Sequence, residues 1–290
     1  MKIKISKKMI VFIVFCGYLV FCQSCMKMRM SSKKTIEYFS KSNTAFKDIN
    51  YKISETNQIH YIETGDATKP TLFFLHGSPG SWDAYKTYLS DSDLQKKYRL
   101  IAIDRPGFGY SNFGDAEDLN AQANLILPFI QSKNNNQAIT LIGHSMGGPV
   151  IVKLATKNPT LFKNLVILAG AIDPKAENPE NWRPILMSKP IRYLIPGAFK
   201  VSNDELWWLK EDLVVMKPEL HKITSKVIII HGTEDSLVPY SNVAFMEKEF
   251  INAQKIVILP IEKADHFIPW SHFEIIKKSL KNRSFKSKIG

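Results

Sequence analysis

Short and nearly continuous apolar runs recur along most of this chain, separated by polar stretches. Two short alternating runs, Tyr51–Ile53 and Ile59–Ile62, predict a hairpin. Six further runs are rich in Ile, Val and Leu, a pattern typical of strands that are buried on both faces of a parallel sheet. These six strands are expected at Thr71–Leu75, Leu100–Ile103, Ile139–Ile142, Leu165–Leu168, Val227–Ile230 and Ile256–Leu259.

Helical stretches are expected between these strands. They are Trp82–Leu89, Asn120–Gln131, Val150–Lys157, Asn242–Phe250 and His272–Leu280. Pro128 lies inside the second stretch and predicts a kink or a shorter helix there. Strands and helices that alternate in this way predict an α/β fold with a parallel sheet covered on both faces. Ligand chemistry in such sheets lies at the carboxyl ends of the strands.

One connection is much longer than the others. Residues 175–223 lie between two predicted strands, and so long a connection is uncommon unless it is functional. Its aromatic residues, placed among prolines and charges, are Trp182, Tyr193, Phe199, Trp207 and Trp208. We interpret this segment as a helical lid over the active site.

The first 24 residues differ from the rest. A basic start is followed by the uncharged apolar run Met9–Phe21. Four lysines make the start basic: Lys2, Lys4, Lys7 and Lys8. The run fits the ~7–15 residues of a secretory signal and is shorter than the ~18 that a membrane-spanning helix needs. Residues 1–24 are therefore predicted to be an export signal, with an uncleaved anchor as the alternative.

The rest of the chain divides at changes in composition. Residues 25–48 are polar and basic and predict a tether with a short helix. Residues 49–283 are expected to form one α/β domain with its lid at 175–223, and residues 284–290 a basic tail. About 265 residues follow the leader, enough for one large domain.

All three cysteines lie in or directly after the leader, at Cys16, Cys22 and Cys25. The body therefore has no thiol nucleophile, thiolate metal site or internal disulfide. The end of the leader, Ser24-Cys25, resembles the signal of bacterial lipoproteins, which implies a lipidated cysteine as the first mature residue. That family favours Leu three residues earlier, where this chain has Cys22. Cys22 is the alternative site, although bulky Phe21 precedes it.

The resemblance implies a protein exported to the cell envelope and held at the membrane, while a plain secreted form stays open. The formal net charge is +12, and removal of the four leader lysines gives 12 − 4 = +8. A basic body attracts anionic membranes or acidic substrates. No dense Lys/Arg patch interleaved with aromatic residues is found, so nucleic-acid binding is not expected.

The segment Gly143-His144-Ser145-Met146-Gly147 has the form G-x-S-x-G between a predicted strand and a predicted helix. This is the context of a nucleophile elbow, in which a strained turn presents the serine hydroxyl. Residues two before and two after the serine must lack a bulky Cβ, and both are glycine. Ser145 is the predicted nucleophile.

A serine nucleophile needs a base, and the base needs an acid that orients it. Asp235 follows the strand Val227–Ile230, and His266 follows the strand Ile256–Leu259. The order Ser, Asp, His is the order of this type of site. We therefore assign His266 as base and Asp235 as acid, with Asp173 as the rival acid.

The oxyanion of acyl transfer needs two N–H donors. The turn 76–80 follows the strand Thr71–Leu75 and faces the predicted elbow. The backbone N–H groups of Ser78 and Met146 are the predicted donors. No grouping of His, Asp and Glu has metal-ligand spacing, and neither a metal nor another cofactor is expected.

These motifs, together with Asp104–Ser111 and Ala264–His266, resemble the α/β-hydrolase superfamily over residues 51–283. The resemblance implies an eight-stranded, mostly parallel sheet, a lid after the sixth strand and a structural role for Asp104–Ser111. Haloalkane dehalogenases and epoxide hydrolases of this superfamily carry aspartate at the elbow, so Ser145 argues against both. The Gly-Gly-Ser-Trp-Gly elbow of proline-releasing peptidases is absent.

The expected reaction is carboxylic ester hydrolysis through an acyl-enzyme, with an apolar acyl or aryl group suggested by the aromatic lid and Trp270. The same triad also serves C–C bond hydrolysis, amide cleavage and acyl transfer, and the sequence does not separate these. A non-catalytic binding protein is a further alternative, which a complete triad disfavours.

Overall fold

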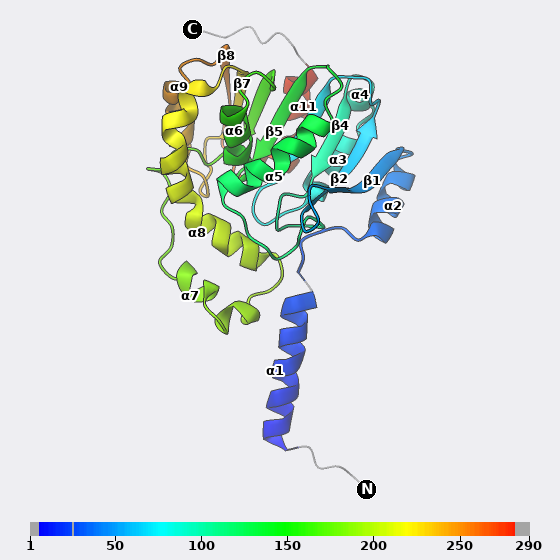
Figure 1. Ribbon diagram of the computed structural model, residues 1–290, viewed down its shortest axis with the longest axis vertical. Helices are drawn as coiled ribbons and strands as arrows, with labels where there is room; N and C mark the ends of the chain where they lie inside the picture. The colour runs from blue at the N-terminus through cyan, green and yellow to red at the C-terminus, as the bar shows by residue number, and fades with distance from the viewer. Residues whose placement is uncertain (1–5, 25, 282–290) are drawn as a thin grey trace.

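An eight-stranded sheet forms the centre of the protein (Figure 1). The computed structural model describes residues 6–24 and 26–281. The strand order is β1-β2-β4-β3-β5-β6-β7-β8. The pairs β1–β2 and β2–β4 are antiparallel. The other five neighbouring pairs are parallel. The strands are β1 (Phe46–Lys52), β2 (Gln58–Gly65), β3 (Thr71–Leu75), β4 (Arg99–Ile103), β5 (Ile139–His144), β6 (Asn164–Leu168), β7 (Lys226–Gly232) and β8 (Lys255–Ile261). The predicted α/β class with a mostly parallel eight-stranded sheet is confirmed.

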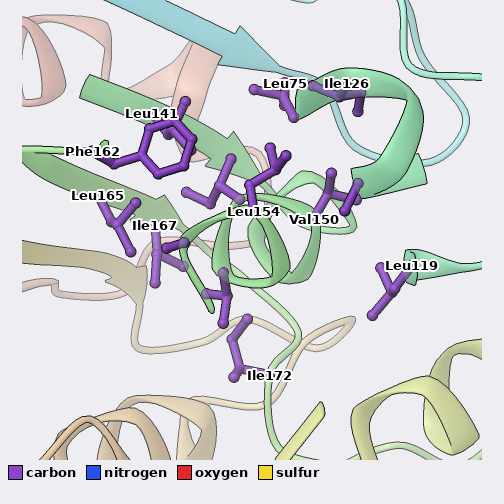
Figure 2. Packing of buried hydrophobic residues seen from close by; sticks show 14 of the residues in the cluster. Leu75, Leu119, Ile126, Leu141, Val150, Leu154, Phe162, Leu165, Ile167 and Ile172 are labelled. Atoms are coloured by element: carbon purple, nitrogen blue, oxygen red, sulfur yellow. The ribbon is translucent and has the colours of Figure 1, made fainter. Parts of the chain in front are cut away.

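Helices cover both faces of this sheet. They are α3 (Lys86–Ser90), α4 (Ser92–Gln95), α5 (Leu119–Ser132), α6 (Gly147–Lys157), α9 (Ser241–Glu249), α10 (Ile268–Ser271) and α11 (Phe273–Lys281), and the 3-10 turn η1 (Trp82–Tyr85) precedes α3. Alternate residues of β3 serve the two faces: Phe73 and Leu75 join one core cluster, and Leu72 and Phe74 join the other. Figure 2 shows the first cluster, to which Val150 and Leu154 of α6 and Leu141 of β5 belong. A strand buried on both faces has no polar side, which explains its unbroken apolar run.

Two details differ from the sequence expectation. The first strand begins at Phe46, inside the predicted tether, and ends at Lys52. The helix α5 continues through Pro128 to Ser132. Pro128 and Asn124, whose carbonyl loses its helical partner, both lie on the exposed side of α5, where water can hydrogen-bond that carbonyl.

The connection between β6 and β7 is helical. It contains α7 (Arg183–Met187), the 3-10 turn η2 (Ile191–Leu194), the long α8 (Phe199–Met216) and the 3-10 turn η3 (Lys217–Lys222). We call residues 175–223 the lid segment. Leu209 and Leu213 of α8 are buried in the same core cluster as α5 and α6.

At the N-terminal end, α1 (Lys7–Ser24) projects from the body beside the lid segment (Figure 1). The Tyr18 hydroxyl donates to the Leu194 carbonyl at 2.9 Å. The short helix α2 (Ser32–Lys41) follows and packs through Phe39 against Trp82. Within residues 6–24 and 26–281, no helix combines the length and the apolarity that crossing a bilayer requires.

Candidate active site

Ser145 lies at a sharp turn between β5 and α6. Its φ is +52°, the left-handed region that a residue with a side chain rarely adopts. Its N–H donates to the Leu168 carbonyl at 2.9 Å, which ties the turn to the end of β6. A Cβ on Gly143 would lie 2.2 Å from the Gly147 carbonyl oxygen, and one on Gly147 would lie 2.3 Å from that of Leu75. The G-x-S-x-G pattern is therefore a steric requirement of this turn.

His266 and Asp235 meet beyond the ends of β8 and β7. The distance between His266 Nδ1 and Asp235 Oδ2 is 2.8 Å, and both residues are buried. Gly232 permits this meeting, because a Cβ there would lie 2.3 Å from the Ala264 carbonyl oxygen. The bond fixes the imidazole so that Nδ1 carries the proton and Nε2 is free to accept one.

The Asp235 carboxylate is stabilised in its charged form. Burial alone would raise its pKa, but hydrogen bonds from His231, His266 and the Val238 N–H outweigh burial and hold the pKa well below its usual range. Oδ1 accepts the N–H groups of Leu237 and Val238 at 2.9 and 2.8 Å. Asp235 therefore stays ionised beside His266 at neutral pH.

His144 links the turn at Ser145 to the loop after β8 that carries His266. Its Nε2 donates to the His266 carbonyl at 3.0 Å, and the two rings lie 4.8 Å apart. Burial, with the neighbouring His266, lowers the pKa of His144 to about 3, so it is neutral. The residue before Ser145 thus holds the backbone of His266. The half-buried Ser145 hydroxyl itself forms no hydrogen bond with the residues that the structure describes.

The turn after β3 faces the elbow, as the sequence predicts for an oxyanion loop. A Cβ on Gly77 would lie 3.0 Å from Ser145 Cβ, so the two backbones are in close contact. Among the described residues, neither the Ser78 N–H nor the Met146 N–H has a hydrogen-bond acceptor. The Ser78 hydroxyl donates to Ser202 Oγ of α8 at 2.8 Å.

Arg105 stabilises this loop by hydrogen bonds to its backbone. Its Nε donates to the His76 carbonyl at 2.8 Å, and its Nη2 donates to the Gly77 carbonyl at 3.1 Å. His76 Nε2 accepts the Arg105 N–H at 3.0 Å. Burial and the adjacent Arg105 charge hold the pKa of His76 well below its usual range, which agrees with a neutral ring that accepts at Nε2.

Glu205 of α8 balances the Arg105 charge, with Oε2 2.7 Å from Nη1 and Oε1 2.9 Å from Nη2. Arg105, Glu205 and Ser202 are not among the site residues predicted from the sequence. Arg105 lies in the recognisable stretch Asp104–Ser111, but nothing in the local sequence marks Glu205 or Ser202.

Asp173, the rival acid, has a local structural partner, and so do Asp265 and His231. Asp173 Oδ1 accepts the Lys175 N–H at 2.9 Å, and Asp265 Oδ1 accepts the Phe267 N–H at 2.9 Å. His231 Nε2 lies 2.9 Å from the Val238 carbonyl and 3.4 Å from Asp235 Oδ2, so it supports the acid. Within the described ranges, no group of three His, Cys, Asp or Glu residues could hold a metal. Cys25, the lipidation candidate, lies outside the described residues.

A family model described as alpha/beta hydrolase fold matches residues 70–193. The chain has the α/β-hydrolase fold. The chain is 24% identical over 267 residues to a bifunctional esterase/perhydrolase of Acinetobacter calcoaceticus, which covers 77% of this chain and 94% of that one. It is also 35% identical over 119 residues to a 2-hydroxy-6-oxononadienedioate/2-hydroxy-6-oxononatrienedioate hydrolase of Paraburkholderia phymatum, over 39% of this chain and 40% of that one.

Among solved α/β-hydrolase structures, an aryl esterase described as putative, from Burkholderia cenocepacia, superposes with a TM-score of 0.63. It covers 81% of this chain and 96% of that one at 20% identity. A likeness at this identity shows the fold alone. Taken together, the family match and the hydrolase relatives support a hydrolase enzyme.

Proposed function

We propose that this protein is a serine hydrolase that cleaves carboxylic esters through an acyl-enzyme. The observation that carries the proposal is the strained elbow at Ser145, beside a buried His266 whose Nδ1 lies 2.8 Å from Asp235. One relative that matches over 77% of this chain is a bifunctional esterase/perhydrolase, which is consistent with ester hydrolysis.

In the proposed mechanism, His266 Nε2 accepts the Ser145 proton as Oγ attacks the ester carbonyl. The N–H groups of Ser78 and Met146 then stabilise the oxyanion. The C–O bond breaks, and the alcohol leaves with the proton from His266. Water, activated by the same histidine, attacks the acyl-enzyme and releases the acid. Catalytic hydrogen bonds are often long without substrate, so the unbonded Ser145 hydroxyl is compatible with this role.

Labelling with a fluorophosphonate tests the proposal. The full chain and its Ser145→Ala variant are treated, and mass spectrometry locates the modified peptide. Labelling at Ser145, with turnover in a series of esters, supports the proposal. A folded protein that is neither labelled nor active on any ester contradicts it and favours the binding-protein alternative.

Carbon–carbon bond hydrolysis is the second candidate. The segment of 35% identity to a 2-hydroxy-6-oxononadienedioate hydrolase favours it, although that match covers only 40% of the relative. The same triad would serve. Incubation with 2-hydroxy-6-oxononadienedioate beside the ester series decides between the two, since the preferred substrate class gives the higher kcat/KM.

We also propose that the protein is exported and anchored by a lipid on Cys25. The alternative acceptor Cys22 is buried, and its Sγ lies 3.2 Å from the Leu194 carbonyl, a contact that a lipid there would break. Incorporation of radioactive palmitate is expected in the wild type and in Cys22→Ala, and its loss is expected in Cys25→Ala. Incorporation that depends on Cys22 instead would contradict this assignment.

A further inference from the structure

The lid segment carries large exposed apolar side chains on its first short elements. Trp182 and Ile185 at α7 are 49% and 56% exposed, Tyr193 of η2 is 52% exposed, and Phe199 at the start of α8 is 39% exposed. The helix α7 packs against both η2 and α8, so these elements form one surface, which we call the lid surface (residues 182–200). Several large apolar groups exposed together indicate an interaction site.

The charge around the lid surface is mainly basic, although Glu180 and Asp204 at its two ends pair with Arg183 and Arg192. Residues 181–203 contain no Asp or Glu and four basic residues: Arg183, Lys189, Arg192 and Lys200. Residues 26–34, which follow the leader, also contain no Asp or Glu and four basic residues: Lys27, Arg29, Lys33 and Lys34. Aromatic and aliphatic groups surrounded by cations are typical of a surface that binds an anionic lipid bilayer.

The chain's own apolar leader reaches the body at this surface. The Gly197 N–H donates to the Cys22 carbonyl at 2.8 Å, and the Ala198 N–H donates to the Met26 carbonyl at 3.0 Å. In Figure 1, α1 projects from the lower edge of the body, the side on which α7 and the start of α8 also lie, and it contacts η2. A retained α1 would leave the protein beside residues 197 and 198. An anchor at this point would bring the lid surface to the bilayer.

The lid surface continues along α8 to residues that contact the oxyanion loop. Phe199 lies one helical turn before Ser202, whose Oγ accepts the Ser78 hydroxyl. The next turn carries Glu205, which pairs with Arg105 behind the same loop. A lipid that leaves the bilayer at the lid surface is therefore one helical turn away from the oxyanion loop.

We propose that the lid surface rests on an anionic bilayer and that the substrates are esters of lipids taken from it. This inference rests on the proposed function of Ser145. The acyl group of the lipid would form an ester bond with Ser145 Oγ, and the lipid alcohol would leave with the proton carried by His266. Water would then release the fatty acid.

The test compares two substrates for the full chain reconstituted in vesicles of phosphatidylcholine and phosphatidylglycerol. One substrate is a fluorogenic acylglycerol in the vesicle, and the other is a water-soluble aryl ester. In the double variant Trp182→Ser, Ile185→Ser, the ratio of vesicle to soluble activity is expected to fall about tenfold, because two apolar side chains lose their burial in lipid. The control is Val214→Ser, Val215→Ser, which alters apolar residues of α8 that are 52% and 64% exposed outside the lid surface. Its ratio should stay at the wild-type value.

A second measurement is independent of activity. Vesicles with brominated lipids quench tryptophan fluorescence on contact, and Trp182→Phe is expected to remove most of that quenching. An unchanged activity ratio, an equal change in the control, or quenching that does not depend on Trp182 overturns the inference. Absence of both labelling at Ser145 and soluble-ester turnover in the wild type would instead contradict the proposed function, while the quenching still reports whether the lid surface contacts lipid.

Discussion

Arg105 and Glu205 form a fully buried ion pair that joins the loop after β4 to the long helix of the lid segment. The side chains are 0% and 1% exposed, and Nη1 lies 2.7 Å from Oε2. The other guanidinium nitrogens hold the His76 and Gly77 carbonyls of the oxyanion loop. One side chain from the loop after β4 therefore positions both the lid helix and the loop that faces Ser145.

We expect Glu205→Gln to lower the free energy of unfolding by about 3–5 kcal/mol, because it leaves the Arg105 charge buried without its counterion. Urea denaturation measures this. The control is Glu37→Gln, which removes an exposed ion pair with Lys41 and is expected to match the wild type. A loss in Glu205→Gln no larger than in this control would show that the buried charge is compensated by other groups.

The strands of the sheet core were predictable, since β3 to β8 each contain a nearly continuous apolar run. The edge strand β1 was not placed correctly. Its sequence Phe46-Lys-Asp-Ile-Asn-Tyr-Lys52 buries little, and an edge strand does not need the regular alternation that marks a half-buried one. The hairpin was therefore expected at Tyr51–Ile53, although β1 ends at Lys52.

The candidate site was predictable where local sequence and strand position coincide. Ser145, Asp235 and His266 each follow a strand, and parallel strands end at the same edge. The pairing of Arg105 with Glu205, 100 residues apart, depends on how the lid packs and has no local signal. For His144 the sequence predicts a structural hydrogen bond in a tight turn, and the structure shows one, but the sequence does not identify the His266 carbonyl as its partner.

Asp235→Asn is expected to lower kcat on a soluble ester by about 10⁴-fold, because an amide donor would face His266 Nδ1 and disfavour the tautomer that accepts the serine proton. Steady-state assays with the soluble ester and the rate of fluorophosphonate labelling measure the loss. The matched control is Asp173→Asn, the same change in the rival acid, with an expected kcat near that of the wild type. If instead Asp173→Asn is inactive and Asp235→Asn is active, the acid has been assigned to the wrong residue.

His60 should make the stability depend on pH. Its Nδ1 lies 2.7 Å from Asp104 Oδ2, and its Nε2 lies 2.8 Å from Asp48 Oδ1, so both nitrogens donate and the ring is charged. Burial alone would lower its pKa, but the two carboxylates outweigh burial and the pKa is raised.

A raised pKa means that this contribution is fully present below the unfolded value of about 6.5 and is lost as pH rises through the folded value. Urea denaturation from pH 6 to pH 10 should therefore show the wild type losing stability relative to His60→Gln. A constant difference between the two proteins over this range would mean that His60 does not titrate there.

Gly77→Ala tests whether the turn after β3 acts in the site. The new methyl would lie 3.0 Å from Ser145 Cβ and 3.1 Å from His144 Nδ1, closer than ordinary contacts. Displacement of the loop from Ser145 is expected to lower kcat/KM by up to about 100-fold. Overpacking at this turn should lower the free energy of unfolding by only about 1–3 kcal/mol. Urea denaturation measures this loss, and it is compared with the loss of kcat/KM. Ser78→Ala serves as the control, because it keeps the backbone N–H and removes only the hydroxyl bonded to Ser202. Its loss of kcat/KM should be much smaller, and equal losses in the two variants would argue that the loop supports the lid rather than the oxyanion.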